Sequence, residues 1–319
     1  MPDIIPAHAP LAVQIRGDLV ESVHYGSLAA LDADGSTLIR RGDPDALFYP
    51  RSALKPLMAV AMVRAGLRLP PEQLALAASS HSGAPEHLAG TLAILVDAGL
   101  DASALRNSTD LPYGTEERRQ WLADGLGPTQ LAQNCSGKHA AMLATCIVNG
   151  WPAESYLGRE HPLPRFIREV VSELTDCPVE TVSTDGCGTE VFAVTLTGMA
   201  RAFGRLATAP EGTAEYDVAA AMRLHPGMVG GTGRDVTDLM AAVPGLIAKD
   251  GFEGVQLVAL ADGSAVAVKV SDGGDRARLP AAAPALLALG VDPAVVRQFN
   301  DLDVIGGGHP VGVLHGLPL

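Results

Sequence analysis

A serine and a lysine three positions apart, Ser52 and Lys55, form the first pattern in this chain that could do chemistry. Pro50 disfavours helix before it and Pro56 is tolerated in an opening turn, so a helix should begin near Ser52. Side chains at i and i+3 share a helix face. A lysine activates a serine nucleophile when burial or another cation favours the neutral amine. Alone, the pattern also fits a helix-capping serine beside a solvated lysine.

A second stretch rich in hydroxyls, Ser80-His81-Ser82, falls in a loop expected between two helices. Such side chains can relay a proton or hydrogen-bond to a substrate. The plainer interpretation is that Ser82 caps the helix starting near Pro85. Glu86 is one residue too far along to complete a capping box, so capping explains this stretch only in part.

Two cysteines lie in turns that glycines permit. Cys135 precedes Lys138 at the start of a predicted helix, where a thiol pKa falls and anions bind. Cys187 lies between two glycines, close to Asp185, and could meet Cys135. These residues could form an anion site, a metal site or a reactive thiol, although the spacing is no standard zinc pattern. A capped helix with a buried thiol and an Asx turn at Asp185 are the plain alternatives.

A lysine at the end of a predicted strand, Lys249, is followed by Asp250 and Gly251. Glycine on an edge strand lets a substrate approach the backbone, and the lysine would add positive charge beside it. Lys269 on the following strand is a rival for that role. Either lysine alone would be interpreted as a surface residue.

The elements that must position these residues are strands at both chain ends and helices between them. Alternating patterns over 10–41 predict an antiparallel meander, and strands return over 245–249, 254–260 and 265–270. No regular pattern follows Val304. Helices are predicted over 52–65, 71–78, 85–98, 115–124, 136–149, 163–174, 193–206, 216–224, 280–289 and 293–299. We therefore expect an α/β protein of the α+β type, an antiparallel sheet with a mainly helical insertion.

The division into domains follows from this order. Residues 1–60 and 205–319 would form the sheet domain and residues 61–204 the helical one, with the site between them. Only 4% of residues are aromatic against 47% hydrophobic, so the core must consist of Ala, Leu and Val.

Composition excludes several classes of partner. The net charge of −13 and the lack of a basic run argue against nucleic acid. No apolar run approaches 18 residues, so no membrane span is expected. The N-terminal residues lack a basic start and a long apolar stretch, so we expect no secretion signal. The four cysteines should then be thiols in a cytoplasmic protein.

Together, five stretches resemble the thermolabile, Rhizobium-type L-asparaginases, in the order that this family has them. Their architecture is similar to that of serine β-lactamases, penicillin-binding proteins and serine glutaminases. Asp250 stands where the penicillin-recognising enzymes have a hydroxyl residue, which argues against β-lactam chemistry. The five stretches are Arg51–Pro56, Ser80–Gly83, Asn134–His139, Asp185–Gly188 and Lys249–Gly254.

The resemblance implies an amidohydrolase that converts L-asparagine to L-aspartate and ammonia. Ser52 would be the nucleophile and Lys55 its base, with Ser80 or Ser82 as proton relay or alternative nucleophile. Lys249 or Lys269 would help to keep Lys55 neutral and would bind the α-carboxylate. The residues expected to bind substrate are Arg51, His81, Asp185, Lys249 and Lys269.

The resemblance also implies a zinc ion held by Cys135, Lys138 and Cys187, and we expect a homodimer. A glutaminase or broader amidase is an alternative, since one methylene changes discrimination only by about 1–3 kcal/mol. A non-catalytic amino-acid- or metal-binding protein is another, although such a protein needs no nucleophile and base.

Overall fold

The computed structural model describes residues 5–319. Met1–Ile4 lie outside the described residues, and with them part of the stretch on which the expectation of no secretion signal rests. Two compact units are present. The sheet unit comprises Met1–Ala53, Val194–Thr208 and Ala242–Leu319, and the helical unit comprises Leu54–Ala193 and Ala209–Ala241. The segment 209–241, expected with the sheet, thus clusters with the helices; a site between two domains stays a prediction.

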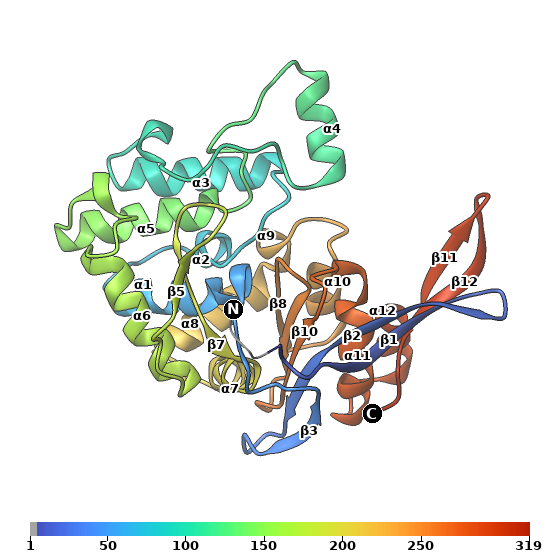
Figure 1. Ribbon diagram of the computed structural model, residues 1–319. Helices are drawn as coiled ribbons and strands as arrows, with labels where there is room; N and C mark the ends of the chain where they lie inside the picture. The colour runs from blue at the N-terminus through green and yellow to red at the C-terminus, as the bar shows by residue number, and fades with distance from the viewer. Residues whose placement is uncertain (1–4) are drawn as a thin grey trace. The chain divides into compact units, whose positions relative to one another are not determined.

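The sheet unit is built around an antiparallel sheet whose strands come from both chain ends, which confirms the predicted fold class (Figure 1). The strand order is β11-β12-β1-β2-β10-β9-β8, with β3 also paired to β2. The strands are β1 (Ala9–Arg16), β2 (Leu19–Leu31), β3 (Thr37–Arg41), β8 (Ile247–Gly251), β9 (Val255–Ala259), β10 (Ala265–Val270), β11 (Leu302–Gly306) and β12 (His309–Gly316).

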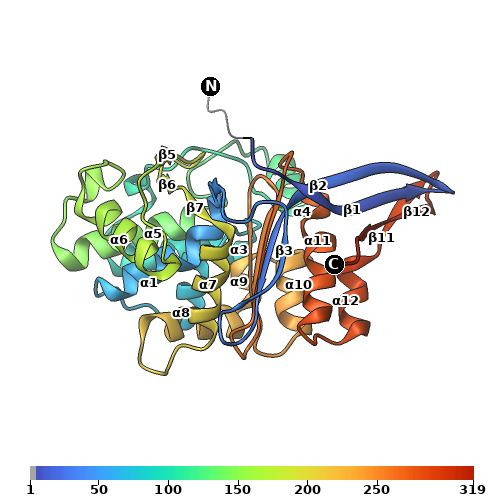
Figure 2. The ribbon, with the colours of Figure 1, turned by 60° about the horizontal axis from the view of Figure 1, so that its bottom comes forward.

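Helices cover both faces of this sheet. Figure 2 views it nearly edge-on, with α7 (Leu196–Ala207) on one side and α11 (Arg278–Ala288) and α12 (Pro293–Asn300) on the other. A short pair, β4 (Leu47–Phe48) with β7 (Val194–Thr195), joins the start of α7 to the chain before Pro50. The strand β8 lies at the free edge, as expected for the strand that carries Lys249.

The expectation of no regular structure after Val304 is wrong. β11 and β12 form a hairpin, and β12 pairs along β1. Gly307 and Gly308 both have positive φ, +59° and +84°, as the two central residues of a type I′ turn require. The glycines that made this tail look irregular are the hairpin turn.

The helical unit is packed around α1, which is buried except for its last residue. All its residues from Lys55 to Val63 are buried, and it packs against α2, α5, α6 and α8. A pair of short strands, β5 (Val182–Thr184) and β6 (Glu190–Phe192), completes the unit. Its helices are α1 (Lys55–Arg64), α2 (Pro71–Ala77), α3 (Pro85–Asp97), α4 (Thr115–Ala123), α5 (Ser136–Asn149), α6 (Pro162–Thr175), α8 (Ala214–Leu224), α9 (Pro226–Val229) and α10 (Asp235–Ala242).

The helix expected from Ser52 begins instead as a 3₁₀ turn over Arg51–Leu54, and α1 starts at Lys55. Pro56 has no N–H, so the Ser52 carbonyl cannot accept an α-helical bond from it. The α9 and α10 helices were not predicted. Within residues 5–319, none of the helices has the length and apolar character needed to cross a membrane.

Candidate active site

The candidate base, the amine of Lys55, is buried. Lys55 is 1% exposed at the first position of α1. Its Nζ donates to the Ser80 hydroxyl at 3.1 Å and to the Ser79 carbonyl at 2.5 Å. Burying an amine is costly unless such groups satisfy its hydrogen bonds. The helical unit thus brings together a lysine and a serine that the sequence had placed in separate motifs.

The loop with Ser80, His81 and Ser82 is extended and pinned on both sides. The N–H groups of Ser80 and Ser82 donate to the carbonyls of residues 229 and 230, at 3.0 and 2.8 Å, whereas that of His81 donates to Asn134. In extended backbone, side chains two apart share a face. Ser80 and Ser82 therefore point to one side of the loop and His81 to the other.

The His81 ring anchors this loop from within. It is fully buried, with Nε2 2.9 Å from the Ser136 hydroxyl, and it stacks on His87 at 5.2 Å. Burial, reinforced by the charges of His87, Lys55 and Arg234, holds the pKa of His81 well below its ordinary value. The neutral ring ties the loop to the start of α5, and a substrate contact for it stays a prediction.

The Ser82 hydroxyl faces a carboxylate that the sequence did not single out. It donates to Oε1 of Glu117 at 2.6 Å. Glu117 is the third residue of α4, where an acidic side chain usually signals only a stabilised helix start. No spacing in the sequence connects positions 82 and 117, because the contact depends on how the α4 segment folds back.

The turn that carries Ser52 is strained and closely packed within the sheet unit. Arg51 has a φ of +54°, a conformation that costs a non-glycine residue about 1–3 kcal/mol and is concentrated at functional sites. Its guanidinium lies 5.3 Å from the centre of the Phe252 ring. Gly251 is needed here, because a Cβ would lie 2.3 Å from the Pro50 carbonyl oxygen. Ser52 itself is partly exposed.

The two rival lysines have different surroundings. Lys249 is fully buried, and its Nζ bonds to the Asp250 carboxylate at 2.6 Å. Strand alternation puts it on the same face of β8 as Gly251, the face that packs on the Ser52 turn. The Lys269 amine donates to the backbone carbonyls of Glu253 and Val270, and burial lowers its pKa against the opposing pull of nearby carboxylates.

The thiols of Cys135 and Cys187 meet, as the sequence suggested. Both are buried and neither is in a disulfide. The Lys138 amine lies 3.1 Å from the Cys187 sulfur and 2.8 Å from the Thr189 hydroxyl. A hydrogen bond from Cys135 and the charge of Lys138 hold the pKa of Cys187 well below its ordinary value, whereas sharing that bond raises the pKa of Cys135.

This donor set fits a zinc ion. Thiolates are preferred zinc ligands, and a neutral lysine amine is an unusual third donor. Among residues 5–319, no group of three or more His, Cys, Asp or Glu side chains is placed to hold a metal, so Lys138 would be an essential ligand.

The predicted turn at Asp185 is present. Its carboxylate accepts from the Gly186 N–H at 2.8 Å, and its carbonyl accepts from Gly188. Of the other two cysteines, Cys146 is buried, whereas Cys177 is partly exposed.

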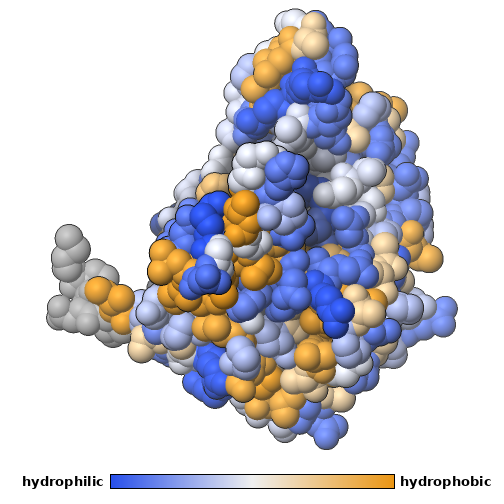
Figure 3. Space-filling view, turned by 90° about the vertical axis from the view of Figure 1, so that its right-hand side faces the viewer, coloured by the Kyte–Doolittle hydropathy of each residue, from blue (hydrophilic) through white to orange (hydrophobic). Residues whose placement is uncertain are grey.

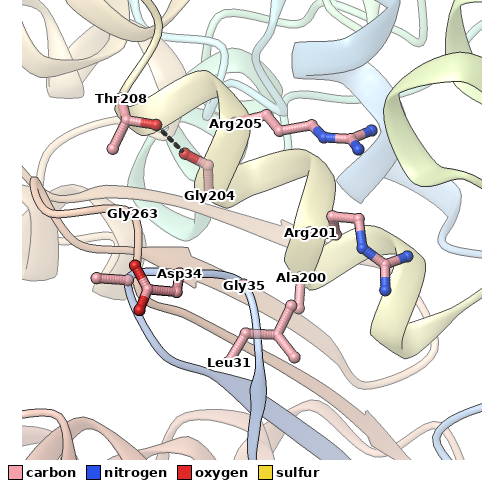
Figure 4. Close-up of a pocket in the computed structure, with 10 residues that line it drawn as sticks. Leu31, Asp34, Gly35, Ala200, Arg201, Gly204, Arg205, Thr208 and Gly263 are labelled. Atoms are coloured by element: carbon pink, nitrogen blue, oxygen red, sulfur yellow. Dashed lines mark hydrogen bonds between the residues drawn. The ribbon is translucent and has the colours of Figure 1, made fainter.

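A surface pocket of about 250 Å³ in the sheet unit contains none of the predicted site residues (Figure 4). Arg201 and Arg205 line it from α7, and Asp34 lies across from them. The position of this pocket therefore does not identify the candidate active site that the motifs predict.

Comparison with known proteins gives the family of this chain. The model of the L-asparaginase II family matches residues 12–315. The chain belongs to the L-asparaginase II family and is a hydrolase of the asparagine-hydrolysing class. No curated protein matches it.

Two solved structures are similar at low identity. A β-lactamase from Mycobacterium bovis is 16% identical over 86% of this chain and 93% of that chain, with a TM-score of 0.45. EstCE1, a hydrolase with promiscuous acyltransferase activity, is 13% identical over 77% and 88%, with a TM-score of 0.40.

Proposed function

We propose that the protein is an L-asparagine amidohydrolase that releases L-aspartate and ammonia. Family membership supports asparagine hydrolysis in general. The observation that carries the proposal is the buried amine of Lys55 at 3.1 Å from the Ser80 hydroxyl, three positions after the partly exposed Ser52.

Ser52 is assigned as the nucleophile. Its hydroxyl oxygen attacks the side-chain amide carbon while Lys55 accepts the proton. The carbon–nitrogen bond then breaks, and the Ser80 hydroxyl gives its proton to the leaving nitrogen, which departs as ammonia, while Lys55 returns the proton taken from Ser52 to Ser80. Water hydrolyses the resulting ester and restores Ser52. The strain at Arg51 and the close approach of Gly251 support this assignment, since both fix the turn.

Ser80 is preferred to Ser82 as the relay. Ser80 contacts the proposed base, whereas the Ser82 hydroxyl is directed to Glu117. Lys249 is preferred to Lys269 as the cation for the substrate's α-carboxylate, because it shares a strand face with Gly251. Arg51 lies beside the nucleophile and is proposed to contact the substrate.

Zinc belongs to this proposal as a cofactor held by Cys135, Lys138 and Cys187. When bound, it would supply a positive charge that orients the substrate's polar groups. Lys138 would have to lose a proton to bind it, so zinc affinity should fall in acid.

Ammonia release from L-asparagine and L-glutamine tests the function directly. We expect turnover with both and a higher kcat/KM for asparagine. A higher kcat/KM for glutamine would make the protein a glutaminase. No ammonia from either, with intact binding of amino acids or zinc, would identify a binding protein.

A further inference from the structure

One carboxylate, that of Glu117, lies beside the hydroxyl group of Ser82 in the candidate site. We propose that Glu117 binds the α-ammonium group of the substrate and so selects α-amino acid amides over simple amides. This inference rests on the proposed function. Its first support is the 2.6 Å hydrogen bond from the Ser82 hydroxyl to Glu117 Oε1.

The second support is the distribution of charge along the loop. Ser80 and Ser82 point to the same side, the first toward the Lys55 amine and the second toward Glu117. An amine and a carboxylate thus flank one short row of hydroxyls. An α-amino acid amide carries an ammonium and a carboxylate near its amide, so an anion in the site is placed to complement its positive end.

The third support is that the base of the α4 segment is fixed to the loop. The Gly114 N–H donates to the Ser82 carbonyl at 2.8 Å. Gly83, with φ +92°, packs so closely on Pro112 that a Cβ would come within 2.8 Å of it. These contacts hold Glu117 at one place beside Ser82.

Arg234 also connects the loop that carries Ser80 to the segment before α4. Its guanidinium lies 4.6 Å from the centre of the Tyr113 ring, and it donates to the Ser80 carbonyl at 3.2 Å. By contrast α4 itself has no buried residue and projects from the helical unit (Figure 1), where Figure 3 shows hydrophilic and hydrophobic surface side by side. Core packing of α4 does not account for the position of Glu117; the contacts at its base do.

Glu116 provides a matched control within the same helical turn. It is exposed and pairs with Arg119 at 2.5 Å. A Glu116→Gln change removes the same charge from the same end of α4 as Glu117→Gln does. Any general effect of charge on the helix start is therefore common to both variants.

The experiment compares L-asparagine with succinamate, which lacks only the α-ammonium group. We expect Glu117→Gln to lower kcat/KM for asparagine about 10- to 100-fold, the size of a lost charged hydrogen bond, and to leave succinamate within twofold. Glu116→Gln should change neither value. Equal losses on both substrates, or no loss on asparagine, would overturn the proposal.

Binding measured without turnover separates this inference from the proposed function. L-aspartate and succinate differ by the same ammonium group, and calorimetric titration gives the affinity for each. We expect the wild type to prefer aspartate and Glu117→Gln to lose that preference. If asparagine is not hydrolysed but this pattern holds, the function fails and the role of Glu117 stands. Equal binding of both ligands by the wild type would reject that role.

Discussion

The Lys55 amine lies 3.1 Å from the Ser80 hydroxyl, although the two residues are 25 positions apart. The Ser-x-x-Lys spacing connects Lys55 with Ser52 by helix periodicity alone. The tertiary structure places the Ser80 hydroxyl at the same amine, in a buried position. This relationship makes the two serines distinguishable by experiment.

Removing each hydroxyl should have a different effect on ammonia release. Ser52→Ala should abolish it, because the nucleophile is lost. Ser80→Ala should lower kcat by about 10²- to 10⁴-fold, the usual contribution of a positioned proton-transfer group. Both are measured by coupled ammonia assay, with thermal unfolding to confirm the fold.

Ser79→Ala is the control for these variants. Its hydroxyl is buried without a hydrogen-bond partner among the described atoms, and only its carbonyl contacts Lys55. It should keep near-native turnover. Near-native activity in Ser52→Ala, with none in Ser80→Ala, would move the nucleophile to Ser80.

A methyl group at Gly251 should disturb the Ser52 turn. Gly251→Ala would place a Cβ 2.3 Å from the Pro50 carbonyl, and relieving such a clash usually costs about 1–3 kcal/mol. We expect a lower denaturation midpoint and a reduced kcat. Gly227→Ala, whose Cβ would meet nothing within 4 Å, is the control. Full activity in Gly251→Ala would show that the edge of β8 does not position Ser52.

One zinc ion per chain is expected in protein purified without added metal. Cys135→Ala and Cys187→Ala should lose it, because each removes one of the two thiolate donors. Cys146→Ala should keep it, since that thiol is buried elsewhere and burial raises its pKa to about 12. Elemental analysis measures the zinc content per chain. A metal-free preparation with full activity would reject a functional role for zinc.

Stability should fall in acid because His81 and His87 are neutral in the fold. Burial is the main cause that lowers both pKa values in the folded protein, whereas an unfolded histidine titrates near 6.5. The unfolded chain then binds more protons below that pH. Each histidine therefore removes up to about 1.4 kcal/mol per pH unit as the pH falls from about 6.5 toward the folded pKa.

Urea unfolding at pH 8 and pH 5 measures this loss. His87→Gln should show a smaller difference between the two pH values than the wild type. His309→Gln, which changes an exposed residue of β12, should leave the difference unchanged. An identical decline in His87→Gln and the wild type would mean that His87 does not carry the effect.

Local sequence patterns were sufficient to predict most of the helices and strands. The helix over Ser136–Asn149 and the strand over Ala265–Val270 were predicted to the residue, because apolar periodicity and glycine turns depend only on near neighbours. The hairpin after Val304 was missed, since its strand character comes from pairing with β1. That partner lies almost the whole chain away, and no local pattern encodes it.

The motifs were likewise visible as residue types, but their partners were not. The sequence alone was enough to single out Lys55, Ser80, Cys135 and Cys187 as candidates, and to suggest the family that the comparison shows. Only the tertiary structure decided that Lys55 reaches Ser80, that His81 faces inward and that Glu117 meets Ser82. Helix and strand periods act over a few residues, whereas these contacts depend on how distant loops pack. Burial then shifts the pKa values of these side chains, and the burial of a side chain depends on the packing of the whole fold.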